Sequence, residues 1–170
     1  METIMDALAT TLLIGTGATA LMDLWVLARK RLLGIPALDY ALVGRWLGGM
    51  PRGRFRHESI AAASPVRHER LIGWAAHYLI GIIFAGVLLL ACGIAWIDAP
   101  TIGPALLVGL GTVAAPFLLM QPGMGAGIAA SRTPRPTAAR VQSLITHAVF
   151  GVGLYGAAWI AKLTVSGFGA

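Results

Sequence analysis

The sequence predicts an all-α integral membrane protein, a four-helix bundle whose helices run alternately down and up. Of its 170 residues, 57% are hydrophobic and only 12% are charged, whereas soluble domains carry roughly a quarter charged residues. Four long apolar stretches follow one another, over about residues 4–28, 71–97, 102–121 and 139–165. Each reaches the ~20 residues that cross a ~30 Å hydrocarbon core as a helix. Together they predict a single membrane domain over residues 1–170.

Each stretch has the composition of a helix rather than of a barrel strand. Barrel strands alternate polar and apolar residues over ~10 positions, whereas these runs are continuously rich in Leu, Ala, Gly and Ile. The start of the first stretch carries Glu2 and Asp6 instead of basic residues, and the stretch exceeds the ~15 apolar residues of a signal peptide. We therefore expect it to be a retained helix. The single cysteine, Cys92, lies in the second stretch, which excludes an intrachain disulfide or a cysteine metal site.

The basic residues predict the orientation in the membrane. Nine of the thirteen lie in the loop 29–70, two lie in the loop 122–138, and Arg140 follows at the start of the fourth stretch. The N-terminal segment and the short loop around Asp98 contain none. Because basic loops stay in the cytoplasm, both basic loops are expected there, with both termini in the periplasm of a bacterial inner membrane. Lys162 lies near the outer end of the fourth stretch, from which it can extend to the headgroups.

The loop 29–70 has a pattern of its own. The segment DYALVGRWL, residues 39–47, has the composition of an interfacial helix, and PRGRFRHESI follows it at residues 51–60. The basic residues that we expect at this interface are Arg45, Arg52, Arg54 and Arg56. Attraction to anionic headgroups is the simpler interpretation, and docking of a partner or an anionic ligand is the alternative. Nucleic acid is not expected, because no recognition fold fits into ~40 residues beside a membrane.

Three ionisable residues lie inside the predicted helices away from their ends, and each needs an explanation because such residues are costly there. Asp23 comes six residues before Arg29, His77 seven after Arg70, and His147 seven after Arg140. At 1.5 Å per residue, all three are expected at a depth of roughly 9–10.5 Å. Gln121, at the inner end of the third stretch, is expected to reach the same layer. These residues predict an intramembrane polar site made of Asp23, His77, His147 and Gln121.

Small residues flank these polar groups at four-residue spacing, which places them on the same helical faces. Such small residues let membrane helices pack closely. The predicted packing residues are Gly15, Thr19, Gly73, Gly81, Ser143 and Gly151.

Three interpretations of the polar layer stay open. The histidines can be structural groups in a membrane subunit, paired with a hydroxyl or with Asp23. The layer can be a transport or proton-handling site, because buried carboxylates and histidines mark ion paths. Such a narrow bundle would then need a homodimer or a partner in a membrane complex. Lastly, His77 and His147 can ligate a b-type haem, or a metal ion with Asp23 as third ligand.

Soluble-type catalysis finds little support in the sequence. No serine elbow, paired carboxylates or phosphate loop is present, so an enzyme is not the expected class and no cofactor is required. The one enzymatic alternative is a lipid-modifying site at the interface, built from His57, Glu58, His68 and Glu69. Solvated loop residues are the simpler interpretation of these four.

Six blocks of sequence are spread over nearly the whole chain. They are GATALMDLW at 17–25, DYALVGRWLG at 39–48, GRFRHESI at 53–60, GWAAHYLIG at 73–81, APFLLMQPGMGAGIAASRTP at 115–134 and SLITHAVFGVGLY at 143–155. Together they resemble the bacterial membrane proteins grouped as domain of unknown function 2938. The resemblance implies an integral membrane protein and implies no activity, substrate or cofactor.

Overall fold

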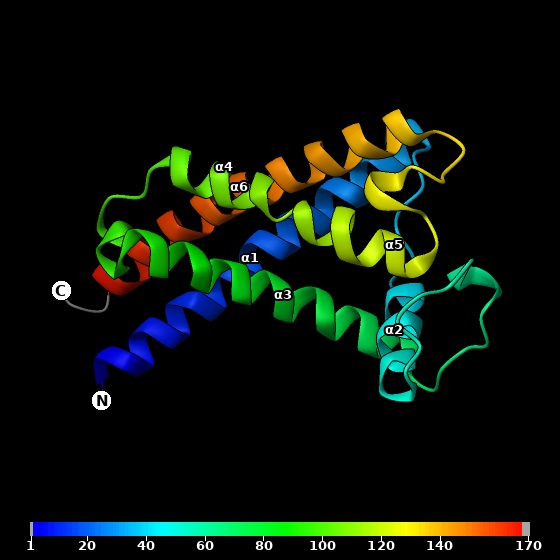
Figure 1. Ribbon diagram of the computed structural model, residues 1–170. Coiled ribbons are helices and arrows are strands. Elements are labelled where there is room, and N and C mark those ends of the chain that lie inside the picture. The colour runs from blue at the N-terminus through cyan, green and yellow to red at the C-terminus, as the bar shows by residue number, and fades with distance from the viewer. Residues whose placement is uncertain (1, 168–170) are drawn as a thin grey trace. The chain divides into compact units, whose positions relative to one another are not determined.

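The chain is helical throughout the part that the structure describes. This computed structural model describes residues 2–167, and within them it contains helices and no strand. Figure 1 labels the α-helices, which are α1 (Glu2–Leu33), α2 (Tyr40–Gly49), α3 (Glu69–Cys92), α4 (Ile102–Gly111), α5 (Gln121–Met124) and α6 (Pro136–Gly167). Short 3-10 turns occupy Met50–Arg52, Ile60–Ala62, Ile94–Asp98 and Ile128–Ala130. The all-α prediction is confirmed.

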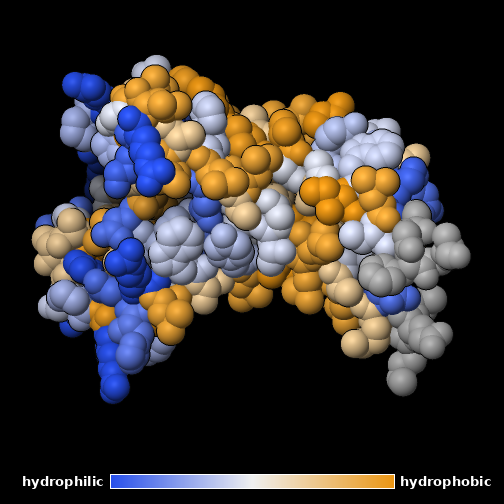
Figure 2. All heavy atoms as spheres, turned by 180° about the vertical axis from the view of Figure 1, so that it is seen from behind, coloured by the Kyte–Doolittle hydropathy of each residue, from blue (hydrophilic) through white to orange (hydrophobic). Residues whose placement is uncertain are grey.

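Four helical segments are long and apolar enough to cross a membrane. They are Met5–Leu33, Glu69–Cys92, Ile102–Met124 and Pro136–Thr164. Many of their large apolar side chains are exposed, as in Leu90 at 88% and Leu107 at 74%, and Figure 2 shows broad areas of hydrophobic surface. In water such surface would be costly, whereas lipid chains cover it without penalty. The chain is therefore a multi-pass membrane protein, as the sequence predicts.

Glycines set the ends of two of these helices. α1 continues beyond residue 28 to Leu33 and ends before Gly34, whose φ is +65°. α3 ends at Cys92, earlier than the expected residue 97, because Gly93 has a φ of +79°. L-residues rarely adopt this left-handed region, whereas glycine enters it without a steric penalty. α2 begins after Asp39, whose side chain accepts a hydrogen bond of 2.9 Å from the Ala41 amide and so caps the helix.

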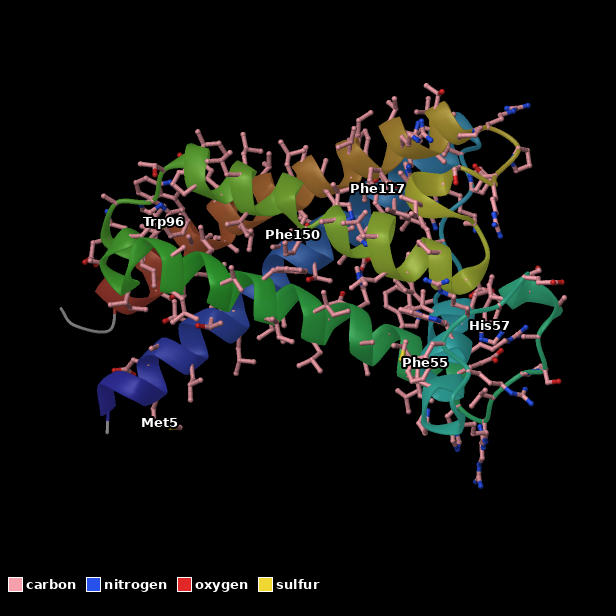
Figure 3. The ribbon with its side chains drawn as sticks, viewed as in Figure 1. Met5, Phe55, His57, Trp96, Phe117 and Phe150 are labelled. Carbon is pink, nitrogen blue, oxygen red and sulfur yellow. The ribbon has the colours of Figure 1, made fainter. Side chains whose placement is uncertain are left out.

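The helices contribute to two compact units, which are described separately. Unit 1 consists of residues 1–35, 78–111 and 146–170. Its core joins residues of α1, α3, α4 and α6, including Ile14, Leu88 and Leu154, none of which is exposed. Phe150, labelled in Figure 3, belongs to the same core.

Unit 2 consists of residues 36–77 and 112–145 and has a smaller core. Val43 of α2, Ile60 of the following loop and Met124 of α5 are buried together there. The third span changes its helical form in this unit, because Pro116 begins a π-helical turn that ends at Met120. Proline has no amide hydrogen to donate to the preceding turn. At the other end of the π-helical turn, the amide of Gln121 donates to the Pro116 carbonyl.

Candidate functional site

Asp23 has a hydrogen-bond donor within unit 1. The hydroxyl of Tyr78, on α3, donates to Oδ2 of Asp23, on α1, over 3.0 Å. Both side chains are half-buried, and both lie inside candidate membrane spans. A carboxylate in a bilayer is costly unless a donor or a cation accompanies it. The tyrosine hydroxyl therefore stabilises the acidic side chain at this position.

The Asp23–Tyr78 pair lies beside a close crossing of α1 and α3. Thr19 is one helical turn before Asp23, and its Oγ1 donates to the Gly15 carbonyl over 2.7 Å. A Cβ added at Gly15 would overlap the backbone of Ile82, and one added at Gly81 would overlap Thr19 Oγ1. Helices approach this closely only where the facing residues are small.

His147 lies at a second close crossing in unit 1, between α4 and α6. A Cβ added at Gly109 would lie 2.8 Å from the His147 carbonyl oxygen and 2.6 Å from the Gly151 amide nitrogen. One added at Gly151 would lie 2.9 Å from the Ala105 carbonyl oxygen. α4 and the C-terminal half of α6 run side by side here (Figure 1). The His147 side chain itself is half-buried.

His77 belongs to an aromatic cluster in unit 2. Its Nε2 shares a hydrogen bond of 2.9 Å with the hydroxyl of Tyr40, and the two rings stack with their centroids 4.4 Å apart. The ring of Trp74 lies 4.5 Å from that of Tyr40 and 5.9 Å from that of His77. The cluster joins α2 to the first part of α3. A metal or haem iron bound at Nε2 would have to displace the Tyr40 hydroxyl.

Two glycines allow α2 to cross the start of α3. A Cβ added at Gly73 would overlap the Tyr40 carbonyl, and one added at Gly44 would overlap the Glu69 carbonyl. In unit 2, Gly73 thus packs against α2. Ser143, the remaining small residue of the sequence prediction, is half-buried on α6 in the same unit.

Gln121 lies at the end of the π-helical turn in unit 2. Its amide oxygen is buried, and no described group donates a hydrogen bond to it. The predicted four-residue layer therefore divides between the units: Asp23 and His147 are in unit 1, His77 and Gln121 in unit 2. Its existence as one site stays a prediction. Among the residues that the structure describes, no three His, Cys, Asp or Glu side chains group closely enough to hold a metal ion.

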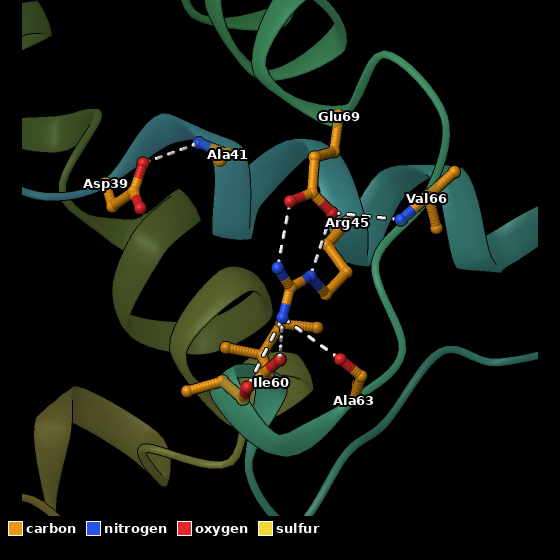
Figure 4. A network of polar contacts seen from close by, with 8 residues as sticks. Asp39, Ala41, Arg45, Ile60, Ala63, Val66 and Glu69 are labelled. Carbon is orange, nitrogen blue, oxygen red and sulfur yellow. Dashed lines mark hydrogen bonds and ion pairs between the residues drawn. The ribbon is translucent and has the colours of Figure 1, made fainter.

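Arg45 is engaged inside unit 2. Its guanidinium group donates to both carboxylate oxygens of Glu69, at 2.8 and 2.9 Å (Figure 4). Its remaining nitrogen contacts three carbonyl oxygens of the loop, those of Ile60, Ala61 and Ala63, at 3.0–3.3 Å. The hydrogen bond with Glu69 is the main reason why the pKa of Arg45 is raised further above its usual value. Arg45 therefore fastens the loop to the first residue of α3.

The other three basic residues predicted at the interface are exposed. They are Arg52, Arg54 and Arg56. The sequence pattern grouped them with Arg45 because it shows charge and not the partner of each charge. Glu69 was assigned to a solvated loop, whereas in the structure it pairs with Arg45. Two hydroxyl partners were also missed, Tyr78 beside Asp23 and Tyr40 beside His77. For Tyr78 the available signal was a tyrosine within an apolar stretch, since a buried hydroxyl needs a hydrogen-bond partner.

Comparison with known protein families assigns the chain to one family. A family model described as protein of unknown function, DUF2938, matches residues 12–161. The chain belongs to the DUF2938 family. The match covers both units and all four candidate spans, apart from the ends of the chain. No curated protein and no solved structure matches it. Membership in DUF2938 assigns no chemistry, and the assignment to a membrane rests on the four candidate spans.

Proposed function

We propose that this DUF2938 protein is a small transport-type or accessory protein of the bacterial inner membrane, with a protonatable site at Asp23. One observation carries the proposal, the 3.0 Å hydrogen bond from Tyr78 to Asp23 within the candidate spans. Acidic residues inside a membrane bundle are rare and usually mark a proton or cation path. The tyrosine hydrogen-bonds one carboxylate oxygen, and a proton or a cation bound at this carboxylate would neutralise its charge within the bilayer.

The charge distribution supports an inner-membrane orientation. Unit 2 holds nine of the thirteen basic residues and three of the seven acidic ones, so the chain's whole net charge of +6 belongs to it. Because positively charged loops remain in the cytoplasm, we place the loops of unit 2 there and both termini in the periplasm. Lys162 on α6 donates to the carbonyl of Asp98 over 2.6 Å, which agrees with both residues being at the outer surface.

Proton or cation flux in proteoliposomes tests this proposal. A pH-sensitive dye inside the vesicles would follow decay of an imposed pH gradient with sodium, potassium or no added cation. We expect the wild type to accelerate the decay over protein-free vesicles and Asp23→Asn to abolish the effect. Asp98→Asn removes the same charge from a loop and should behave as the wild type. Equal decay for wild type, Asp23→Asn and empty vesicles under every condition would refute the proposal.

A structural role for the histidines is a second candidate, favoured by the Tyr40–His77 hydrogen bond. A histidine already paired with a hydroxyl joins α2 to α3 without further chemistry. His77→Ala would then lower the thermal unfolding midpoint and leave the flux of correctly folded protein unchanged. Loss of flux in His77→Ala at unchanged stability would instead assign His77 to the ion path.

A further inference from the structure

The segment after α2 presents three arginines and one aromatic side chain. We call residues 52–56 the Arg–Phe loop. Arg52, Arg54 and Arg56 are exposed, and Phe55, which Figure 3 labels, is 59% exposed and lies between two of them in the sequence. An exposed ring among cations offers apolar and cationic contacts together, which suit a partner that is both apolar and anionic.

The backbone of the Arg–Phe loop is held in place on both sides of the aromatic residue. Gly53 turns the chain with a φ of +73°. The Arg54 amide donates to the Gly49 carbonyl over 3.2 Å, and the Trp46 indole donates to the Phe55 carbonyl over 2.9 Å. Because these bonds already fix the backbone of the loop, little backbone conformational entropy remains to be lost on binding.

The Arg–Phe loop is also fixed at the level where two candidate spans end. The amide of His57, the next residue, donates to the Gly123 carbonyl over 2.9 Å, and the third span ends at Met124. On the other side, α2 is tied through Arg45 to Glu69, the first residue of the second span. All these contacts lie within unit 2. The loop therefore lies beside the headgroup region.

We propose that the Arg–Phe loop binds anionic phospholipid, with Arg52, Arg54 and Arg56 on the phosphate groups and Phe55 among the upper acyl chains. The net positive charge of unit 2 is complementary to such headgroups. Phe55 distinguishes a lipid from a soluble anion, because only a lipid also supplies apolar surface for the ring. This inference does not depend on the role of Asp23.

Native mass spectrometry of the full chain tests the proposal. The protein would be released from detergent containing equal amounts of phosphatidylglycerol and phosphatidylcholine, and the bound lipids counted. The loop variant is Arg52→Gln/Arg54→Gln/Arg56→Gln. Its charge-matched control is Arg67→Gln/Arg132→Gln/Arg135→Gln, three exposed arginines of the same unit outside the loop. Phe55→Ser is the third variant and keeps every charge.

We expect the wild type and the charge-matched control to retain phosphatidylglycerol in preference to phosphatidylcholine. The loop variant should lose that retention by roughly fivefold per arginine, on the order of a hundredfold in all. Phe55→Ser should weaken it severalfold at unchanged charge. Equal losses in the loop variant and its control would overturn the proposal in favour of general attraction. Full retention of phosphatidylglycerol in Phe55→Ser would also overturn the proposal. This second test stays valid even if the loop variant fails to fold.

Discussion

Gly81 should not accept a methyl group unless Thr19 is shortened at the same time. The Cβ of Gly81→Ala would overlap Thr19 Oγ1, whereas the next nearest atoms, the Gly15 carbonyl oxygen and Thr19 Cβ, would be 3.4 Å away. The steric conflict thus rests on one side-chain atom. Overpacking of this kind costs about 1–3 kcal/mol. At Gly86→Ala the nearest atom is 3.7 Å away, so this control should change stability by less than about 0.5 kcal/mol.

The double variant Thr19→Ala/Gly81→Ala removes the overlapping oxygen and should recover most of the loss. We expect a coupling free energy of about 1–2 kcal/mol between the two positions, within the range for residues in contact. Gly15→Ala should find no such rescue, because its Cβ would meet the backbone of Ile82. Backbone atoms cannot be removed by substitution.

Equilibrium unfolding in mixed detergent–dodecyl sulfate micelles measures these free energies. Four single variants and the double variant would be compared at one temperature, with tryptophan fluorescence as the signal. The reasoning is refuted if Gly81→Ala is as stable as Gly86→Ala. It is refuted equally if Thr19→Ala/Gly81→Ala is no more stable than Gly81→Ala alone, since the overlap would then lie elsewhere.

Three further predictions concern the polar contacts. Arg45→Gln and Glu69→Gln should each speed tryptic cleavage of the loop after α2, and Arg45→Gln should have the larger effect because it also loses the bonds to the loop carbonyls; equal cleavage of both variants and the wild type would contradict the role of Arg45. Tyr40→Phe should cost about 1 kcal/mol by removing the hydroxyl bonded to His77, measured as a lower unfolding midpoint; His77→Ala added to it should cost less than in the wild type. Lys162→Met should lower the unfolding midpoint, because it removes both the contact with the Trp159 ring, about 0.5–1 kcal/mol, and the hydrogen bond to the Asp98 carbonyl; an unchanged midpoint would show that neither contact is stabilising.

Hydropathy alone predicts the four spans, because a membrane-spanning helix needs about 20 consecutive apolar residues and few other structures produce so long an apolar stretch. Hydropathy predicts the helix ends less well, since backbone conformation and not polarity decides where a helix ends. α1 runs past the charged Arg29 to Leu33 because a helix can continue beyond the membrane without unwinding. It ends where Gly34 turns the backbone. The same reason ends α3 before Gly93.

The polar contacts follow still less from the sequence. Depth counting from the basic boundaries identifies Asp23 as an intramembrane acid, but a depth does not name a partner. Tyr78 is its donor through the packing of α1 against α3, a contact between residues far apart in the chain. Arg45 was grouped with headgroup-binding residues for its charge, whereas Glu69, 24 residues later, pairs with it. Pairings of this kind depend on the tertiary fold.

The central proposal is that Asp23, in contact with Tyr78 inside the candidate spans, binds a proton or a cation. Infrared difference spectroscopy of the reconstituted protein during a pH step measures this directly. We predict a carboxylic-acid carbonyl band that is absent from Asp23→Asn, unchanged in Asp98→Asn, and shifted in Tyr78→Phe because one hydrogen bond is lost. A spectrum in which Asp23→Asn keeps every carboxyl band of the wild type would contradict the claim.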